Sequence, residues 1–160
     1  VEAARSVDVG CVRMTERHLH SDPPTADEVT AATADVDRAI DEATATVPLD
    51  GLHVLVGLAG SVTTITAHAL RLPRYDPVAI HLSRLPADQI VGACTELLGM
   101  SRAERAVLPY MHPGRVDVIG AGALVWRRIV ERVSEATGIT DVVTSEHDIL
   151  DGIALSAAGR

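Results

Sequence analysis

The sequence predicts a single α/β domain with a small sheet and several helices. Short runs rich in β-branched residues are separated by longer stretches in which apolar residues recur every three or four positions. The first pattern is typical of strands, and the second of helices that bury one face. Serine or threonine with an acidic residue three positions later precedes some of the periodic stretches, as in helix capping boxes. With 160 residues, 47% of them hydrophobic, the chain can bury one substantial core.

The chain begins with a predicted strand over 6–12, where apolar and polar residues alternate. A short helix is predicted over 14–19, followed by a turn at two consecutive prolines. Thr25 and Glu28 have the spacing of a capping box, so a helix is expected to begin there, and Pro48 ends it. The apolar stripe of this helix consists of Val29, Val36, Ile40, Ala43 and Val47.

A second predicted strand, over 52–57, leads through a glycine-rich turn into a helix over 61–70. The segment 78–82 is predicted to be a short extended piece. A helix is then expected from Pro86, because proline fits the first helical turn and the apolar residues that follow have helical spacing. Those apolar residues are Ile90, Val91, Cys94, Leu97 and Leu98.

Two further helices are predicted before the last strand. Ser101 and Glu104 repeat the capping-box spacing over a short helix. The longest helix is expected after Pro113 and Gly114, and Gly138 ends it as a C-terminal glycine. Its apolar face consists of Val116, Ile119, Ala123, Trp126, Val130 and Val133.

The C-terminal region is predicted to contain one strand and one helix. The β-branched run 140–144 favours a short strand. Ser145 with Asp148 is expected to cap the last helix, which extends to about residue 157. No repeat or low-complexity linker interrupts the sequence, so residues 1–160 are interpreted as one domain.

The turn after the second strand is the first candidate binding site. Gly57 and Gly60 are expected to adopt positive φ and to let a ligand approach the backbone. The unpaired N–H groups of the following helix suit phosphate, and Ser61, Thr63 and Thr64 add hydroxyls. The turn matches neither G-x-G-x-x-G nor G-x-x-x-x-G-K-[ST]. A plain strand-to-helix turn with a capping serine therefore stays open beside the phosphate-binding interpretation.

Charge and composition exclude some classes of function. The formal net charge is −8, whereas a general nucleic-acid surface needs a basic face. No apolar run approaches the roughly 18–20 residues of a membrane span, and no signal peptide is recognisable, so a cytoplasmic location is expected. All fourteen basic residues are arginine, which a GC-rich coding bias explains without reference to function. Because the chain begins with Val1, it is interpreted as processed or as a piece of a larger protein.

The cysteines and histidines do not predict a metal site. Cys11 and Cys94 lie among apolar neighbours and are expected to be buried, reduced thiols. None of the seven histidines forms the pair spacing of a zinc enzyme. Ser61 is a poor candidate for a nucleophile, since its turn is not G-x-S-x-G.

Arg115 has two possible interpretations. It is expected in the first turn of the longest helix, where a positive side chain opposes the helix dipole. It therefore either has a partner elsewhere or is an ordinary solvated arginine, and the residues alone favour the solvated arginine.

Four segments, in order, resemble motifs of the exopolyphosphatase/guanosine-pentaphosphate phosphatase (Ppx/GppA) family. Residues 6–17 (SVDVGCVRMTER) are similar to a strand followed by G-x-x-R-x-T-E, and residues 57–64 (GLAGSVTT) to G-x-[GA]-G-T-x-T-T with serine for threonine. Residues 104–109 (ERAVLP) with 114–119 (GRVDVI) resemble E-R…L-P…R-A-D-V-I, and residues 145–152 (SEHDILDG) the closing S-x-x-x-x-[RL]-[ED]-G. Together these motifs extend over nearly the whole chain.

The resemblance implies a fold and a set of site residues. The fold is the ribonuclease-H-like domain of the actin/Hsp70/sugar-kinase superfamily, whose members have two such domains around a cleft. The resemblance makes the turn after the second strand a phosphate- or nucleotide-binding loop and makes Arg115 able to reach a polyanion, in place of the solvated arginine. The implied binding residues are Gly57, Ala59, Gly60, Ser61, Thr63, Thr64 and Arg115.

The resemblance also implies what the chain lacks. Residues 1–160 correspond to the C-terminal half of a two-domain phosphatase, and the family's catalytic glutamate and D-x-G-G-G-S-T-E segment lie upstream. The parent protein is expected to hydrolyse terminal phosphoanhydrides of polyphosphate or pppGpp with Mg²⁺. The isolated chain has no catalytic residue of its own and is expected to be inactive. Its partners would be the missing N-terminal domain or a second copy of the chain. The alternative is a non-catalytic domain that binds a nucleotide or phosphate.

Overall fold

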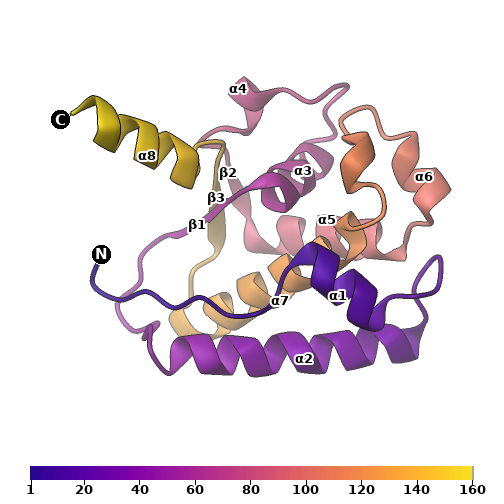
Figure 1. Cartoon of the computed structure of the whole chain (residues 1–160), viewed down its shortest axis with the longest axis horizontal. Helices are drawn as coiled ribbons and strands as arrows, with labels where there is room; N and C mark the ends of the chain where they lie inside the picture. The colour runs from indigo at the N-terminus through magenta and orange to yellow at the C-terminus, as the bar shows by residue number, and fades with distance from the viewer. Residues whose placement is uncertain (160) are drawn as a thin grey trace.

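The computed structural model describes residues 1–159 and has a small mixed sheet beside several helices (Figure 1). The sheet has the order β1–β3–β2, with β1 at Leu55–Leu58, β2 at Arg84–Pro86 and β3 at Asp141–Ser145. Strands β1 and β3 are parallel, with Leu58 opposite Ser145, whereas β2 is antiparallel to β3. The carboxyl ends of β1 and β3 therefore meet at one edge of the sheet, where open α/β sheets bind ligands.

Helices make up most of the described chain. They are α1 (Cys11–His18), α2 (Ala26–Thr44), α3 (Gly60–Ala69), α4 (Pro77–Ile80), α5 (Ala87–Gly99), α6 (Arg102–Ala106), the 3₁₀ turn η1 (Pro113–Arg115), α7 (Ile119–Thr137) and α8 (Ile149–Ala158). Among residues 1–159, no helix combines the length and the apolar composition needed to cross a membrane.

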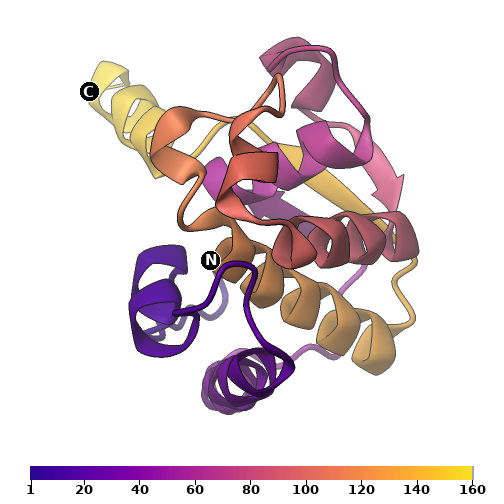
Figure 2. The same ribbon diagram turned by 90° about the vertical axis from the view of Figure 1, so that its right-hand side faces the viewer.

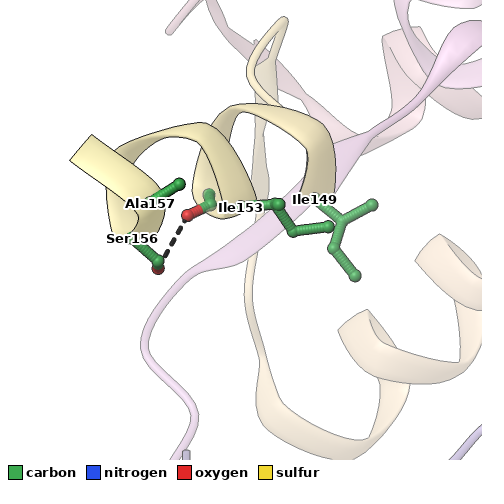
Figure 3. A pocket seen from close by; sticks show the side chains of 5 residues that line it. Ile149, Ile153, Ser156 and Ala157 are labelled. Carbon is green, nitrogen blue, oxygen red and sulfur yellow. Dashed lines mark hydrogen bonds between the residues drawn. The ribbon is translucent and has the colours of Figure 1, made fainter. Parts of the chain in front are cut away.

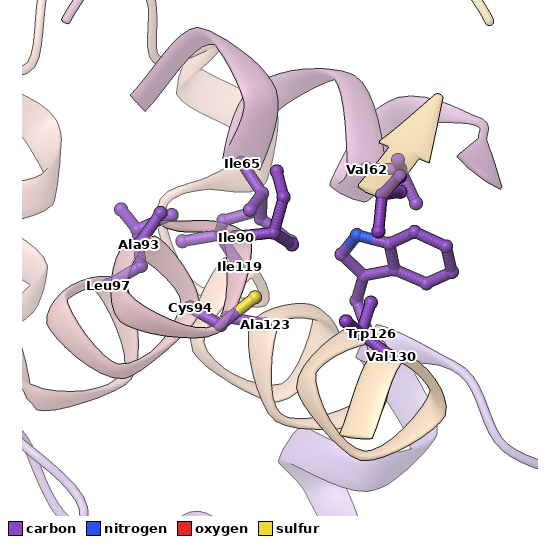
Figure 4. Packing of buried hydrophobic residues seen from close by; sticks show 11 residues of the cluster. Val62, Ile65, Ile90, Ala93, Cys94, Leu97, Ile119, Ala123, Trp126 and Val130 are labelled. Carbon is purple, nitrogen blue, oxygen red and sulfur yellow. The ribbon is translucent and has the colours of Figure 1, made fainter. Parts of the chain in front are cut away.

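Helix α7 lies between two apolar layers (Figure 2). On one side it packs with α3, α5 and the inner face of the sheet, where Trp126 and Val62 lie next to each other (Figure 4). On the other side it packs against α1 and α2 through the buried side chains of Met14 and Leu124. The main cluster consists of Val62, Ile65, Ile90, Ala93, Cys94, Leu97, Ile119, Ala123, Trp126, Val130 and Val142. The predicted α/β class with a small sheet and several helices is thus confirmed.

Local capping signals located several helix ends correctly. The capping boxes of Thr25 with Glu28 and Ser101 with Glu104 are both present. Gly138 ends α7 in the left-handed conformation, with φ of 74°. The prediction for α8 was wrong in detail: Asp148 caps it with Asp151.

Two predicted extended segments were wrong. Residues 6–12 form no strand, because no neighbouring strand pairs with them; α1 begins at Cys11 instead, and Val9 packs against the cluster of α1, α2 and α7. The segment 78–82 lies largely in α4, because the Asp76 carboxylate accepts hydrogen bonds from the N–H groups of Val78 and Ala79 and so begins a helix. Strand β2 follows it and was not predicted.

Two other expectations need correction. Helices α2 and α7 are equally long, with 19 residues each. Cys94 is buried as expected, and burial raises the pKa of its thiol to about 12. Cys11 is only half-buried, since it begins α1 at the surface.

Candidate phosphate-binding site

The turn between β1 and α3 places backbone amides at the carboxyl edge of the sheet. Strand β1 ends at Leu58, α3 begins at Gly60, and Ala59 between them has φ of 73° and ψ of 168°. The expected positive φ values of Gly57 and Gly60 are not found, and Ala59 makes the turn instead. Only glycine adopts this region without cost, so the turn is strained. No side chain caps the first turn of α3, so the capping serine of the alternative interpretation is not found.

Gly57 serves packing in this structure. A Cβ atom at position 57 would lie 2.5 Å from Cζ2 of Trp126 and 2.7 Å from Cγ1 of Val62. The absence of a side chain therefore lets the end of β1 rest directly on the indole ring, which fixes the position of the turn relative to α7.

Gly60 allows Arg115 to reach the first turn of α3. A Cβ atom at position 60 would lie 2.5 Å from Nη2 and 2.7 Å from Cζ of Arg115. Nη1 of Arg115 donates a hydrogen bond of 2.8 Å to Oγ1 of Thr64, which in turn donates to the carbonyl oxygen of Gly60 at 2.8 Å. The guanidinium group is thus fixed beside the free amides of the turn. Arg115 itself lies in η1, before α7, and not in the first turn of α7 as expected.

Tyr75 and Glu146, which sequence reasoning missed, complete this corner. The hydroxyl oxygen of Tyr75 lies 2.7 Å from Oγ1 of Thr63 and 2.7 Å from Oε1 of Glu146, which follows β3. Burial raises the pKa of Tyr75, so its proton remains in place at neutral pH. The Arg115 guanidinium carbon lies 6.0 Å from the centre of the Tyr75 ring, at the outer limit of a cation–π contact. Nothing in the sequence around Tyr75 signals these contacts, since they join separate elements.

The three hydroxyls of the turn do not all face one ligand position. The side chain of Ser61 lies against α7, where a Cβ atom on Gly122 would be 2.5 Å from its Oγ. Thr63 and Thr64 are both buried. Thr63 is hydrogen-bonded to Tyr75, and Thr64 is hydrogen-bonded to Gly60 and Arg115. The groups left for an incoming anion are the amides of the turn and the remaining N–H groups of Arg115.

A surface cavity of about 350 Å³ opens beside Arg115. It gives a ligand access to the guanidinium from the side of η1. Its lining residues are Tyr75, Pro109, Tyr110, Met111, His112, Pro113 and Arg115.

Arg105, from the E-R motif, has a different role from Arg115. Its side chain is buried, and its Nε and Nη2 donate to the carbonyl oxygens of Leu97 and Leu98 at 2.9 Å and 3.2 Å. A Cβ atom on Gly120 would lie 2.6 Å from its Nη2, so that glycine leaves room for the guanidinium. Arg105 therefore provides hydrogen-bond donors to carbonyl oxygens in the last turn of α5 and supports the core, away from solvent.

His68 contributes to the buried structure of the domain. His68 is buried, and its ring nitrogens contact the hydroxyl of Tyr110 and the Glu96 carboxylate, the latter at 2.9 Å. Burial lowers the pKa of His68, and the Glu96 hydrogen bond opposes this only in part. Within residues 1–159, no group of three or more His, Cys, Asp or Glu residues is arranged to hold a metal ion.

Comparison with known proteins relates this geometry to a family. The family model for Ppx/GppA phosphatases matches residues 1–157. Exopolyphosphatase 2 of Mycobacterium tuberculosis is 52% identical over 159 residues, which are 99% of this chain and 50% of that protein. The crystal structure of an exopolyphosphatase-like protein superposes with a TM-score of 0.94 at 45% identity, covering 97% of this chain and 50% of that one. The Aquifex aeolicus Ppx/GppA phosphatase has a TM-score of 0.80 at 24% identity, covering 95% and 48%.

Two facts follow from these matches. The chain spans about half the length of the curated relatives that it matches. The match of the family model over residues 1–157, together with the folds of the solved relatives, confirms the resemblance that the four motifs indicated. The chain belongs to the Ppx/GppA phosphatase family.

Proposed function

We propose that this chain is the C-terminal, substrate-binding half of an exopolyphosphatase or pppGpp phosphohydrolase. The observation that carries the proposal is the contact of Arg115 with Gly60 and Thr64, residues that lie more than 50 positions earlier in the sequence. This contact places a charged donor beside the uncapped first turn of α3. Backbone amides at a helix start and an arginine fork are both suited to phosphate oxygens.

The proposed ligand is a chain of phosphates. The chain as a whole carries a net charge of −8 and repels a polyanion, so binding depends on a local group of donors. Arg115 supplies a cation whose position is fixed by Thr64 and by the ring of Tyr75. The proposed binding residues are Gly60, Ala59 and Arg115 in direct contact, with Thr63 and Thr64 as positioning residues. Gly57 and Ser61 would position the turn against α7.

The donors at this corner do not fit a resident Mg²⁺ ion. Mg²⁺ prefers carboxylate, water and phosphate oxygens. The one carboxylate that the described contacts bring to the corner is Glu146, and it is bonded to Tyr75. We therefore propose that Mg²⁺ belongs to the parent enzyme, through the phosphates and the other half of the protein.

Hydrolysis is proposed for the parent protein and not for residues 1–160 alone. Attack of water on a terminal phosphate needs a positioned base, and the Glu146 carboxylate instead accepts a hydrogen bond from the Tyr75 hydroxyl. We expect the isolated chain to release no phosphate from polyphosphate or pppGpp.

The test compares the purified chain with the full-length protein, using phosphate release with Mg²⁺ from both substrates. The proposal predicts release by the full-length protein alone. Release by the isolated chain above a blank would contradict the proposed division between the halves. If the full-length protein binds polyphosphate but releases no phosphate, this chain is instead a domain of a non-catalytic, phosphate-binding protein.

A further inference from the structure

Two hollows in the surface of the described chain differ in the side chains that line them. The larger, of about 560 Å³, runs along α8 and is lined by Ile149, Gly152, Ile153, Ser156 and Ala157. Figure 3 shows that the Ser156 hydroxyl turns back to the carbonyl oxygen of Gly152, so these residues offer a ligand no free hydroxyl. The cavity beside Arg115 is instead bordered by Tyr110, whose hydroxyl belongs to a hydrogen-bond network separate from that of Thr63 and Thr64.

This network joins three parts of the fold through the buried ring of His68. His68 lies in the last turn of α3, and its Nε2 is 2.9 Å from a carboxylate oxygen of Glu96 in α5. Arg71 donates hydrogen bonds of 2.9 Å and 2.8 Å to the two oxygens of the same carboxylate. The other ring nitrogen of His68, Nδ1, is hydrogen-bonded to the hydroxyl of Tyr110, in the segment between α6 and η1.

The protonation states of these groups set the direction of each hydrogen bond. Burial would raise the pKa of Glu96, but hydrogen bonds from Arg71 and His68 outweigh it and lower this pKa, so the carboxylate is ionised and only accepts. Nε2 of His68 therefore carries a proton. Because burial lowers the pKa of His68, the ring holds no second proton at neutral pH, and Nδ1 accepts. Tyr110 is then the donor, and burial raises the pKa of its hydroxyl, which keeps that proton in place.

Tyr110 is the buried point of the segment that carries Arg115. Within residues 106–118, all of which the structure describes, it is the only buried residue, with 5% of its surface exposed. Backbone hydrogen bonds in this segment are local, such as the one from the N–H of Arg115 to the carbonyl oxygen of His112. The cavity beside Arg115 also leaves part of the segment without packing. The side chain of Tyr110 thus fixes a segment that is otherwise largely exposed.

The segment is held at both ends of α3. Arg115 contacts Gly60 in the first turn of this helix, and Tyr110, five residues earlier in the sequence, is bonded to His68 in the last turn. Tyr75 adds a second connection, because it packs against the apolar cluster that contains Tyr110 and its ring centre lies 6.0 Å from the guanidinium carbon of Arg115. A shift of Tyr110 therefore moves η1, and with it the guanidinium, relative to the amides of the phosphate turn.

We propose that Tyr110, held by His68 and Glu96, is a positioning residue for Arg115. The proposal rests on the proposed function, in which Arg115 binds phosphate in the full-length protein. Tyr110 acts through Arg115, because its hydroxyl is occupied by His68 and not by a ligand. The network keeps Arg115 in the binding position in a larger fraction of molecules, and apparent affinity falls in proportion when that fraction falls.

Tyr110→Phe in the full-length protein tests the proposal, because it removes the hydroxyl and keeps the ring. We expect KM for polyphosphate to rise about threefold to tenfold, the equivalent of one neutral hydrogen bond, with kcat unchanged. A variant that is merely less stable loses active molecules and so lowers kcat at unchanged KM. Val36→Ala, in the separate apolar cluster of α1, α2 and α7, is the control for such a loss of stability and should leave KM unchanged.

A double variant shows whether Tyr110 acts through Arg115. If it does, adding Tyr110→Phe to Arg115→Ala should raise KM no further than Arg115→Ala alone, because coupled residues are not additive. Two effects that multiply would show that Tyr110 acts independently of Arg115, and would overturn the proposal. An unchanged KM in Tyr110→Phe would overturn it as well.

The same variants separate this proposal from the proposed function when polyphosphate affinity is measured by calorimetry. If Arg115→Ala weakens binding and Tyr110→Phe does not, the phosphate site stands and the positioning role is refuted. If neither variant weakens binding, both the phosphate site and the positioning role are refuted. A threefold to tenfold loss of affinity in Tyr110→Phe, in a full-length protein that releases no phosphate, would support the positioning role and refute hydrolysis alone.

Discussion

The guanidinium of Arg115 occupies the space that a side chain at position 60 would need, with Nη2 only 2.5 Å from an ideal Cβ on Gly60. A glycine at the start of α3 and an arginine in η1 thus form one unit, completed by the 2.8 Å hydrogen bond from Arg115 to Thr64. The relationship explains why two motifs that lie far apart in the sequence form one corner of the fold.

Gly60→Ala should displace Arg115 from the turn. The added methyl group overlaps the guanidinium, which must leave Thr64 and so lose a fixed position beside the amides. We expect polyphosphate affinity of the full-length protein, measured by calorimetry, to fall by about tenfold, equivalent to the loss of one hydrogen bond to a charged group.

Gly92→Ala is the matched control for that substitution. Gly92 lies inside α5, and apart from its chain neighbours and the backbone of its own helix no atom lies within 4 Å of an added Cβ. Alanine there should leave affinity unchanged and stabilise the fold by about 0.5–1 kcal/mol. Unaltered affinity in Gly60→Ala would contradict the role given to the Gly60–Arg115 contact.

Ala59→Gly should stabilise the protein. Alanine at φ of 73° and ψ of 168° costs about 1–3 kcal/mol, whereas glycine adopts this region freely. Glycine also raises the entropy of the unfolded chain, which subtracts about 0.4–1 kcal/mol. The net expectation is a gain of about 1 kcal/mol in the free energy of unfolding, measured with urea. A loss of stability would show that Ala59 is not strained.

The capping box at α2 should make stability depend on acidic pH. Hydrogen bonds from the backbone N–H of Thr25, and from Ser21 and His20, lower the pKa of Glu28 to about 2. The pKa of Glu28 is lower in the folded state than in the unfolded chain. Its contribution to the free energy of unfolding is therefore complete above its ordinary pKa of 4.5 and is lost as the pH falls toward 2.

Glu28→Gln tests this contribution. The variant should be less stable than the parent sequence at pH 7, and the difference should shrink between pH 4.5 and pH 2. A difference in stability that stays constant from pH 4.5 to pH 2 would show that these hydrogen bonds do not lower the pKa of Glu28.

Local signals in the sequence predicted several helix ends, whereas the formation of strands depended on contacts between distant segments. Thr25 with Glu28 and Gly138 act within one helical turn, so their effect can be inferred from spacing. The alternation over 6–12 indicated a strand, but a strand also needs a neighbour to pair with, and residues 1–159 supply none.

The candidate site shows the same division. The glycine turn could be inferred from its spacing, and the family resemblance identified Arg115. The partners Tyr75 and Glu146 could not be found, because they are 12 and 71 residues from the groups that they contact. The positive φ of Ala59 could not be predicted, because positive φ is far more common for glycine and was therefore expected at Gly57 and Gly60.

The control for Arg115 must be an arginine without a partner. Arg128, in α7, is a poor choice because it is paired with Asp37 at 2.8 Å and with Glu131. Arg74 is exposed and forms no ion pair within residues 1–159. Its removal changes the net charge by the same amount as the removal of Arg115 and alters no described contact.

The affinity of the full-length protein for polyphosphate, compared between Arg115→Ala and Arg74→Ala, tests the central claim most directly. With both variants shown to fold by circular dichroism, Arg115→Ala should weaken binding by about 1.5–3 kcal/mol, or roughly 10- to 150-fold, and Arg74→Ala should change it little. If Arg115→Ala binds both polyphosphate and pppGpp as tightly as Arg74→Ala does, Arg115 is not part of a phosphate site.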